Sequence, residues 1–240
     1  MALEVKYFEL NGINLAQFTY SITDSQEPET GTIPNMGDEN RQFAEDDRGL
    51  RTIIWEGYVS NDETYLNLRK VLLDNTVKVL KLHPERKITL LSLGFKKRLD
   101  VKKPEDSRMT ITMLAADTRE YSTVRDSATA AVTSSPADIQ ITTEGSAPTA
   151  PEWTLIAIGA IINPAISNGA DRMEWYGTLD LGDVMVISKD GAVSINGSRS
   201  GNMSGTVPEA DAGKNTFVYS DDPGSSHNCT IEATWNDAYY

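Results

Sequence analysis

Few side chains in this chain of 240 residues are suited to catalysis, since it has one cysteine, Cys229, and two histidines, His83 and His227. Nucleophilic catalysis needs a serine or cysteine beside a histidine that takes its proton, and a third group that orients the histidine. Ser226 and His227 are adjacent, but they lie in SDDPGSSHN, a stretch typical of a polar loop. His83 precedes Pro84 between two expected strands, which is typical of a turn. We therefore expect neither histidine to be a catalytic base.

Four carboxylates lie close together in the second half of the chain, at Asp171, Glu174, Asp180 and Asp183. Glycoside hydrolysis uses a pair of carboxyl groups, so an enzyme, either a depolymerase or a peptidase, is one hypothesis for this segment. Asp183, however, follows Gly182 between two expected strands, and Gly-Asp is typical of a turn. We expect a structural role for Asp183 and no enzymatic activity.

The chain offers few ligands for a metal ion. One cysteine and two histidines leave almost no nitrogen or sulfur donors for a transition metal. The twelve-residue pattern of an EF-hand calcium loop does not occur. We expect no metal and no cofactor, and Cys229 has no partner for an intrachain disulfide.

Aromatic side chains in the second half are candidates for a surface that stacks on sugars or on a partner: Trp153, Trp175, Tyr176, Tyr219 and Trp235. Such residues more often belong to the core. Trp175 and Tyr176 are neighbours on an expected strand, so their side chains point to opposite faces and at most one of them is buried. Trp175 and Tyr176 are therefore the candidate ligand or partner surface.

Acidic residues dominate the charge, with 35 Asp and Glu against 22 Lys and Arg and a formal net charge of −13. This charge repels nucleic acid phosphates and anionic membranes, so we expect neither partner.

The longest apolar run, 153–162, is shorter than the roughly 20 residues that span a bilayer, and the first residues lack a signal pattern. Basic residues between Lys78 and Lys103 are interleaved with acidic ones, which favours a mixed surface facing solvent or another subunit over an anion-binding surface.

The composition predicts two β-rich domains joined by a connector. Residues 1–126 contain several expected strands, an Asn11-Gly12 hairpin turn, a long acidic excursion at 23–49 and one helix at about 61–73. One helix among strands is typical of an α+β, barrel-like domain. Residues 127–150 are rich in Ser, Thr, Ala and Pro, which is typical of a linker, although IQIT within them could form a short strand. Residues 151–240 alternate short strands with frequent turns, as in an all-β sandwich.

A series of turn and strand residues between residues 145 and 240 points to a family. The series is Asn163-Pro164, Gly177, Gly182-Asp183, Asn196-Gly197, Pro208, Gly213, Asn215, Tyr219 and Tyr239. In this order it resembles the C-terminal domain of the distal tail proteins of siphophages, the long-tailed, non-contractile bacteriophages. The order of elements in the first half is similar to the N-terminal domain of the same family.

The resemblance implies a mainly β fold, with an N-terminal α+β split-barrel ring domain and a C-terminal galectin-like β-sandwich that serves in attachment. It also implies a structural protein of the virion, made in the host cytoplasm and placed at the distal end of the tail. Six copies would form a ring, the baseplate hub, that joins the tail tube protein to a tail-tip hub protein and to receptor-binding proteins. With a net charge of −13 per copy, ring assembly should strengthen with salt unless opposite charges meet at the interface.

An alternative is a carbohydrate-binding tail accessory module for host attachment, which would stack sugars on Trp175 or Tyr176. The combination of His, Asn, Arg and Trp that marks true galectins is absent from the sequence. Sugar binding is therefore the secondary hypothesis.

Overall fold

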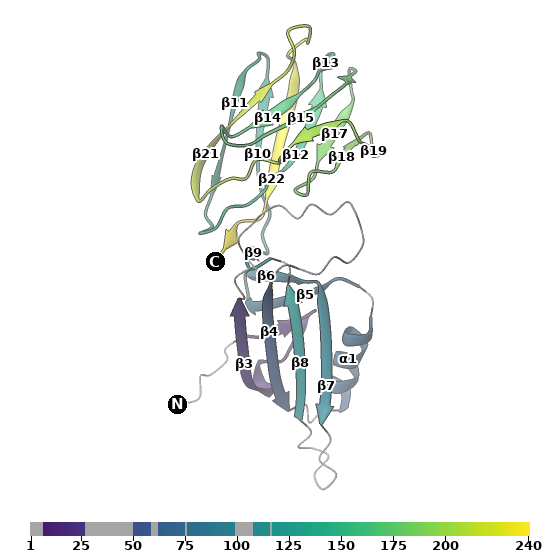
Figure 1. Ribbon diagram of the computed structural model, residues 1–240, viewed down its shortest axis with the longest axis vertical. Helices are drawn as coiled ribbons and strands as arrows, with labels where there is room; N and C mark the ends of the chain where they lie inside the picture. The colour runs from purple at the N-terminus through teal and green to yellow at the C-terminus, as the bar shows by residue number, and fades with distance from the viewer. Residues whose placement is uncertain (1–6, 27–49, 59–61, 75, 99–107, 116) are drawn as a thin grey trace, which may run out of the picture. The chain divides into compact units, whose positions relative to one another are not determined.

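The computed structural model describes residues 7–26, 50–58, 62–74, 76–98, 108–115 and 117–240 (Figure 1). The chain divides into two compact units, Met1–Glu120 and Tyr121–Tyr240, here called unit 1 and unit 2. Strands make up most of the regular structure, which confirms the predicted mainly β fold. Of the predicted excursion at 23–49, residues 23–26 end a strand and the rest lies outside the described residues.

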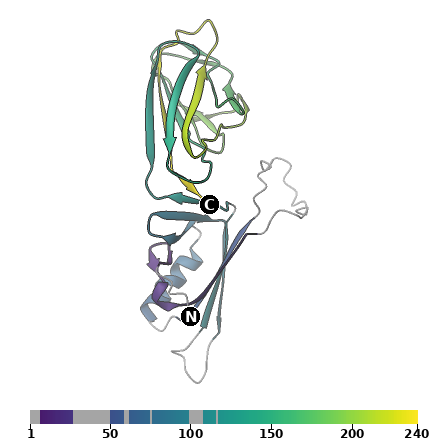
Figure 2. The ribbon, with the colours of Figure 1, turned by 90° about the vertical axis from the view of Figure 1, so that its left-hand side faces the viewer.

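Unit 1 contains two antiparallel sheets and one α-helix. Its elements are β1 (Glu9–Leu10), β2 (Ile13–Asn14), a 3-10 helix (Ala16–Phe18), β3 (Thr19–Gln26), β4 (Arg51–Tyr58), α1 (Asp62–Leu73), β5 (Lys78–His83), β6 (Arg86–Leu90), β7 (Ser92–Arg98) and β8 (Arg108–Ala115). One sheet places β2, β1, β5 and β6 side by side, and the other has the order β3-β4-β8-β7. In Figure 2, α1 lies on one side of the second sheet.

The hairpin predicted at Asn11-Gly12 is confirmed. β1 and β2 pair with Leu10 opposite Ile13, so a two-residue loop connects them. Asn11 and Gly12 have φ angles of 46° and 83°, as a type I′ turn requires at both central positions. The Asn11 side chain also accepts a hydrogen bond from the N–H of Val79 in β5 at 2.6 Å, which ties this turn to the neighbouring strand.

The predicted helix at about 61–73 is confirmed as α1, Asp62–Leu73, and residue 61 lies outside the described residues. Leu68 and Leu72 are buried in the core of unit 1, and Tyr65 and Val71 pack against that core. These four positions follow the helical spacing that the sequence shows. Leu73, at the end of the helix, is exposed.

Strand β4 supplies the centre of unit 1. Its side chains alternate between the core and the outer face of the sheet, and Ile53 and Trp55 are fully buried. The Trp55 ring stacks on Phe8, with ring centroids 6.3 Å apart, and its indole N–H donates to the Thr19 hydroxyl at 2.8 Å. A Cβ at Gly57 would lie 2.2 Å from the Trp55 ring, so this position requires glycine.

Unit 2 is a sandwich of two antiparallel sheets, which confirms the predicted β-sandwich (Figures 1 and 2). Its strands are β10 (Asp126–Val132), β11 (Ala137–Thr143), β12 (Glu152–Ala157), β13 (Ile161–Ile162), β14 (Ala165–Ser167), β15 (Arg172–Trp175), β16 (Thr178–Leu179), β17 (Val184–Ile187), β18 (Val193–Ile195), β19 (Ser198–Ser200), β20 (Met203–Gly205), β21 (Gly213–Ser220), β22 (Cys229–Trp235) and β23 (Ala238–Tyr239). One sheet has the order β10-β22-β12-β17-β18-β19 and the other β11-β21-β14-β15-β20. The short strand β9 (Glu120–Ser122) lies at the division between the units.

The segment 127–150, predicted as a linker, instead belongs to the sandwich. β10 pairs with β22 along its whole length, and β11 pairs in the same way with β21. The division between the units also falls earlier than predicted, between Glu120 and Tyr121. Both strands lie at sheet edges, and on β10 small inward side chains such as Ala128 and Ala130 suffice to cover the core, so β10 lacks the bulky residues that mark a central strand. β11 contains the short strand that IQIT allowed, and it buries Ile139 and Ile141.

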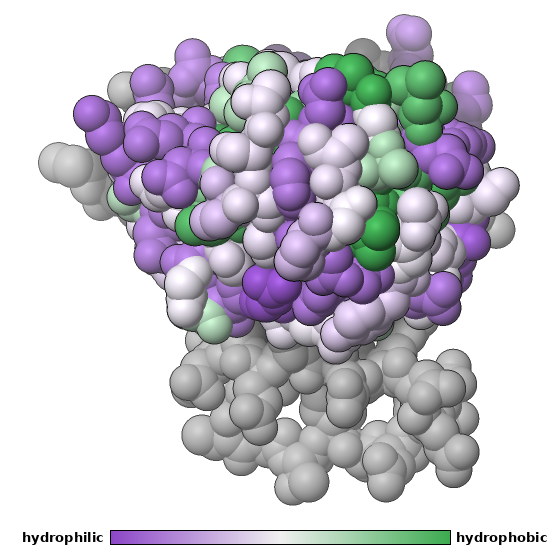
Figure 3. All heavy atoms as spheres, turned by 90° about the horizontal axis from the view of Figure 1, so that it is seen from above, coloured by the Kyte–Doolittle hydropathy of each residue, from purple (hydrophilic) through white to green (hydrophobic). Residues whose placement is uncertain are grey.

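Unit 2 has its own apolar core, in which the Trp153 and Phe217 rings meet at an interplanar angle of 64° with centroids 4.9 Å apart. Figure 3 looks down on the molecule and shows polar side chains over most of this face, with apolar areas among them. Leu181 and Ile158, in loops of unit 2, are among its exposed apolar residues. In the described part of the chain, no helix is long and apolar enough to cross a membrane.

Candidate functional site

The two aromatic residues proposed as a partner surface have opposite surroundings. Trp175 is 6% exposed and its indole N–H donates to the Ser200 hydroxyl at 2.8 Å, so its ring belongs to the core of unit 2. Tyr176, the next residue, is 49% exposed. The alternation predicted for this pair is therefore present, and only Tyr176 offers a ring face to solvent.

Of the four carboxylates considered for catalysis, those of Asp183 and Glu174 have side-chain partners, whereas Asp180 and Asp171 form hydrogen bonds through their backbone N–H groups. Asp183 accepts hydrogen bonds from the Asn196 side chain at 2.8 Å and from the N–H of Asp180 at 2.9 Å. The Asn196 bond, followed by the Asp180 bond, lowers the pKa of Asp183. Glu174 pairs with Arg172 on the same strand, and the N–H of Asp171 donates within the Asn168 turn. Asp183 thus closes a turn, as the sequence predicted.

A hydrogen-bonded series of side chains, His227, Asp221 and Tyr219, was not predicted from the sequence. The ring Nδ1 of His227 lies 2.6 Å from Asp221 Oδ1, and the Tyr219 hydroxyl donates to Asp221 Oδ2 at 2.9 Å. The Asp221 side chain is fully buried, and the nearby Ser135 hydroxyl accepts a hydrogen bond from the N–H of Asp221.

Burial is the main cause that raises the pKa of Tyr219, and it also raises the pKa of Cys229 to about 11. Cys229 is therefore a protonated core thiol and not a nucleophile.

A buried arginine, Arg51, lies at the start of β4 and binds side chains and backbone from two other segments of unit 1. The Arg51 guanidinium donates to Asp24, to Glu120 and to the carbonyl of Thr118, at distances between 2.6 and 3.1 Å. Burial by itself lowers the pKa of Arg51, but the hydrogen bonds and charges of Asp24 and then Glu120 outweigh it and raise this pKa. Arg51 therefore fixes the position of β3 relative to β4 and to the last residues of unit 1.

The outer face of the same sheet carries an aromatic and charged cluster. Arg108 pairs with Glu56 and lies over the Tyr20 ring, 4.9 Å from its centroid. The Tyr20 and Tyr58 rings meet edge to face with centroids 6.2 Å apart, and both are exposed. The hydrogen bond from Arg108, and then the one from Ser21, lower the pKa of Glu56.

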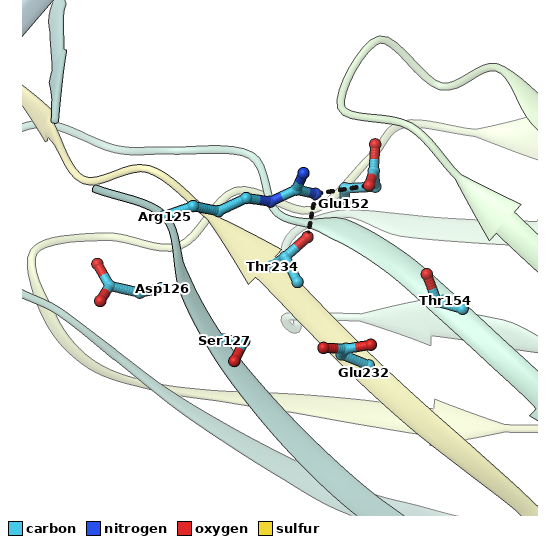
Figure 4. Close-up of a pocket in the computed structure, with 7 residues that line it drawn as sticks. All are labelled: Arg125, Asp126, Ser127, Glu152, Thr154, Glu232 and Thr234. Carbon is cyan, nitrogen blue, oxygen red and sulfur yellow. Dashed lines mark hydrogen bonds and ion pairs between the residues drawn. The ribbon is translucent and has the colours of Figure 1, made fainter. Parts of the chain in front are cut away.

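A groove of about 420 Å³ lies on the outer face of the first sheet of unit 2. It is lined by Arg125, Asp126, Ser127, Glu152, Thr154, Glu232 and Thr234 (Figure 4). Arg125 reaches across β22 and pairs with Glu152 at 2.6 Å, and it also donates to the Thr234 hydroxyl. Asp126 and Glu232 have no hydrogen-bond or ion-pair partner among the described residues. No group of three or more His, Cys, Asp or Glu in the described part of the chain is arranged to hold a metal ion.

Neither the family models nor the curated proteins contain a match to the chain. Among solved structures, the crystal structure of SPP1 Dit (gp 19.1) matches with a TM-score of 0.61 and 12% sequence identity. The match covers 98% of this chain and 99% of that one. The chain has a Dit-like fold. The SPP1 protein is described as a paradigm of the hub adsorption apparatus in phages that infect Gram-positive bacteria. The expected resemblance to distal tail proteins is thus confirmed for the fold, and this Dit-like fold includes both units.

Proposed function

We propose that the chain is a structural protein of a siphophage virion, the distal tail or hub protein at the end of the tail. The observation that carries this proposal is that the Dit-like fold extends over 98% of the chain and 99% of SPP1 Dit. A match to one domain alone would support only a shared module. In this role the protein acts without catalysing a reaction.

The finer part of the proposal is a ring of six copies formed by unit 1. The four-stranded sheet β3-β4-β8-β7 is antiparallel throughout and ends in two long strands, β3 with 8 residues and β7 with 7. Because the sheet has an even number of strands, β3 and β7 run in opposite directions, so β7 of one copy can continue the antiparallel pattern with β3 of the next copy. The two edges are different patches, as a closed ring of identical subunits requires.

In this proposal, unit 1 continues the tail tube on one side of the ring and unit 2 serves as the attachment surface for tail-tip and receptor-binding proteins. The exposed apolar residues Ile158, Leu181 and Tyr176 of unit 2 support a role in contacts with other proteins. A sugar-stacking role is less well supported, because Trp175 is buried and Tyr176 is then the one exposed ring of the proposed pair.

The proposal is tested by the mass of the purified full chain, measured by light scattering at two concentrations and two salt levels, followed by negative-stain imaging of the largest species. Six-fold rings with a central opening are expected. The matching binding experiment mixes these rings with the tail tube protein and the tail-tip protein of the same phage. A chain that stays monomeric under all conditions and also on tail tubes would contradict the proposal.

A further inference from the structure

Unit 2 has one side with long sheet edges and one side with short ones. β10 and β11, with 7 residues each, are the end strands of the two sheets, whereas the opposite ends are β19 and β20, with 3 residues each. Proteins usually protect long edges with lysine, proline or a bulge, because an open row of N–H and C=O groups recruits other strands. The short edges need no such protection.

β10 lacks all of these protections. It pairs with β22 in unbroken register from Asp126 to Val132, without a bulge, and its sequence DSATAAV contains neither lysine nor proline. Among the described residues, no other backbone group bonds to its free side. Every second residue of β10 therefore presents an unpaired N–H and C=O to a further strand.

The outer face of the sheet beside β10 carries short side chains and the carboxylate of Glu232. Ser127, Thr129 and Ala131 are the exposed side chains of β10, and Thr129 lies directly opposite Glu232 of β22. Because these side chains are short, the groove described above stays open, and the unpartnered carboxylate of Glu232 faces it (Figure 4). Arg125 is already paired with Glu152 and does not neutralise Glu232.

We propose that β10 is the acceptor for an extended segment of a partner protein that adds as a further strand and places a lysine or arginine over Thr129 toward Glu232. Neighbouring strands are about 5 Å apart, so the added strand would lie about 10 Å from β22. The long stem of a basic side chain, together with the Glu232 side chain, spans this distance. Backbone pairing supplies the affinity, and the acidic groove supplies the preference for a basic residue.

Charge selects this occupant over a second copy of the chain. Two β10 edges brought together would place the acidic grooves of both copies next to each other, and residues 151–240 carry 12 acidic against 4 basic residues. Like charges that face each other across strands are destabilising. The other long edge, β11, exposes Asp138, Gln140 and Thr142, and none of the residues that line the groove lies on it. The inference concerns unit 2 alone and does not depend on the ring proposed for unit 1.

The test uses the full chain and a short capped peptide of alternating threonine and valine with one central lysine, compared with its glutamate twin. Hydrogen exchange is followed residue by residue. We expect the lysine peptide to slow amide exchange in β10 but not in β11, and to bind about fivefold more tightly than the glutamate twin, given the size of cross-strand charge pairs.

Two substitutions test the role of the groove. Glu232→Gln should reduce the preference for the lysine peptide to about twofold, and Thr129→Lys, which supplies the cation from within the chain, should abolish it. Gln140→Lys on β11 is the matched control, with the same charge at an exposed edge position, and should leave binding unchanged. The Tm of each variant shows that folding is retained.

Three results would overturn the inference. They are the absence of protection in β10 at millimolar peptide, protection confined to other strands, and equal affinity for the two peptides in the unmodified chain. Protection of β10 that rises with protein concentration in the absence of peptide would identify a second copy as the occupant instead.

Discussion

Arg51 and Asp24 are 27 residues apart in the chain, and the Arg51 Nη2 nitrogen lies 2.6 Å from the Asp24 Oδ2 oxygen. The Arg51 side chain is 6% exposed, and Glu120 shares it at 3.0 Å. This network joins the ends of three separate segments of unit 1. A buried charge of this kind is costly unless all its partners are in place, so the arrangement is sensitive to the loss of any one of them.

Arg51→Met is therefore expected to destabilise unit 1 by about 3 kcal/mol, because it leaves Glu120 mostly buried without its cation. Denaturant unfolding followed by amide exchange in β4 and β8 measures this loss. Arg125→Met is the control, since Arg125 and Glu152 form an exposed pair and their loss should cost less than about 1 kcal/mol. Equal effects of the two substitutions would contradict a special role for Arg51.

The ion pair between Arg108 and Glu56 makes stability depend on pH. The pKa of Glu56 is lowered in the folded chain, so the folded state binds this proton less readily than the unfolded state. The stabilisation is fully present above the pKa of the unfolded glutamate, and it is lost as the pH falls through the lower pKa of the folded state. Carboxyl NMR titration should show Glu56 ionised at a pH where an ordinary glutamate is half protonated.

Arg108→Met should raise the pKa of Glu56 toward its usual range, because it removes the first cause of the shift, while Ser21 retains a smaller effect. It should also remove the part of the acid dependence of stability that the pair causes. Arg125→Met should leave the Glu56 titration unchanged. An unaltered Glu56 curve in Arg108→Met would show that the pair is not formed in solution.

Local features of the sequence were sufficient to predict several elements. The Asn11-Gly12 hairpin and the helix α1 depend on neighbouring residues, and the opposite orientations of Trp175 and Tyr176 follow from strand geometry. The sandwich of unit 2 was predicted because its turn signals recur at short intervals.

Features that depend on distant residues could not be predicted in the same way. The partners of Arg51 lie 27 and 69 positions away in the chain, and the groove is built from three strands that only the sheet brings together. The sequence predicts a linker where β10 lies, because this edge strand packs on the core with small residues such as Ala128 and Ala130, whereas the alternation of Ile139 and Ile141 did allow a short strand within β11. Tertiary pairing, and not propensity, decides such segments.

The substitution Asp183→Asn tests whether Asp183 stabilises a turn or takes part in catalysis. Asp183 accepts two hydrogen bonds that close the turn before β17, so its substitution should lower the Tm of unit 2 modestly. Asp171→Asn is the control, since it lies in the same acidic segment, and it should leave the Tm unchanged. Incubation of the unmodified chain with host polysaccharides and peptides should give no product. Product that forms with the unmodified chain and disappears in a fully folded Asp183→Asn variant would contradict the non-enzymatic proposal.

Salt should strengthen ring assembly, because each copy carries a formal net charge of −13 and the copies repel one another. Light scattering at rising salt concentration, at fixed protein concentration, measures the change in the fraction of rings. Assembly that weakens with salt would show instead that basic residues such as Lys96 on β7 meet acidic residues of the next copy.

Cysteine cross-linking tests which edges meet in the ring. The native Cys229 is fully buried with its pKa raised to about 11, so it does not react near neutral pH. Thr23 on β3 and Gly94 on β7 are exposed, and a Cβ at Gly94 meets no atom within 4 Å. With a flexible thiol cross-linker, the double variant Thr23→Cys and Gly94→Cys should give a ladder of covalent oligomers that ends at six copies. Each single variant places its cysteine on only one of the two edges and should remain monomeric on a denaturing gel. Ladders from a single variant, or none from a double variant that still forms rings, would show that β3 and β7 are not the edges that meet.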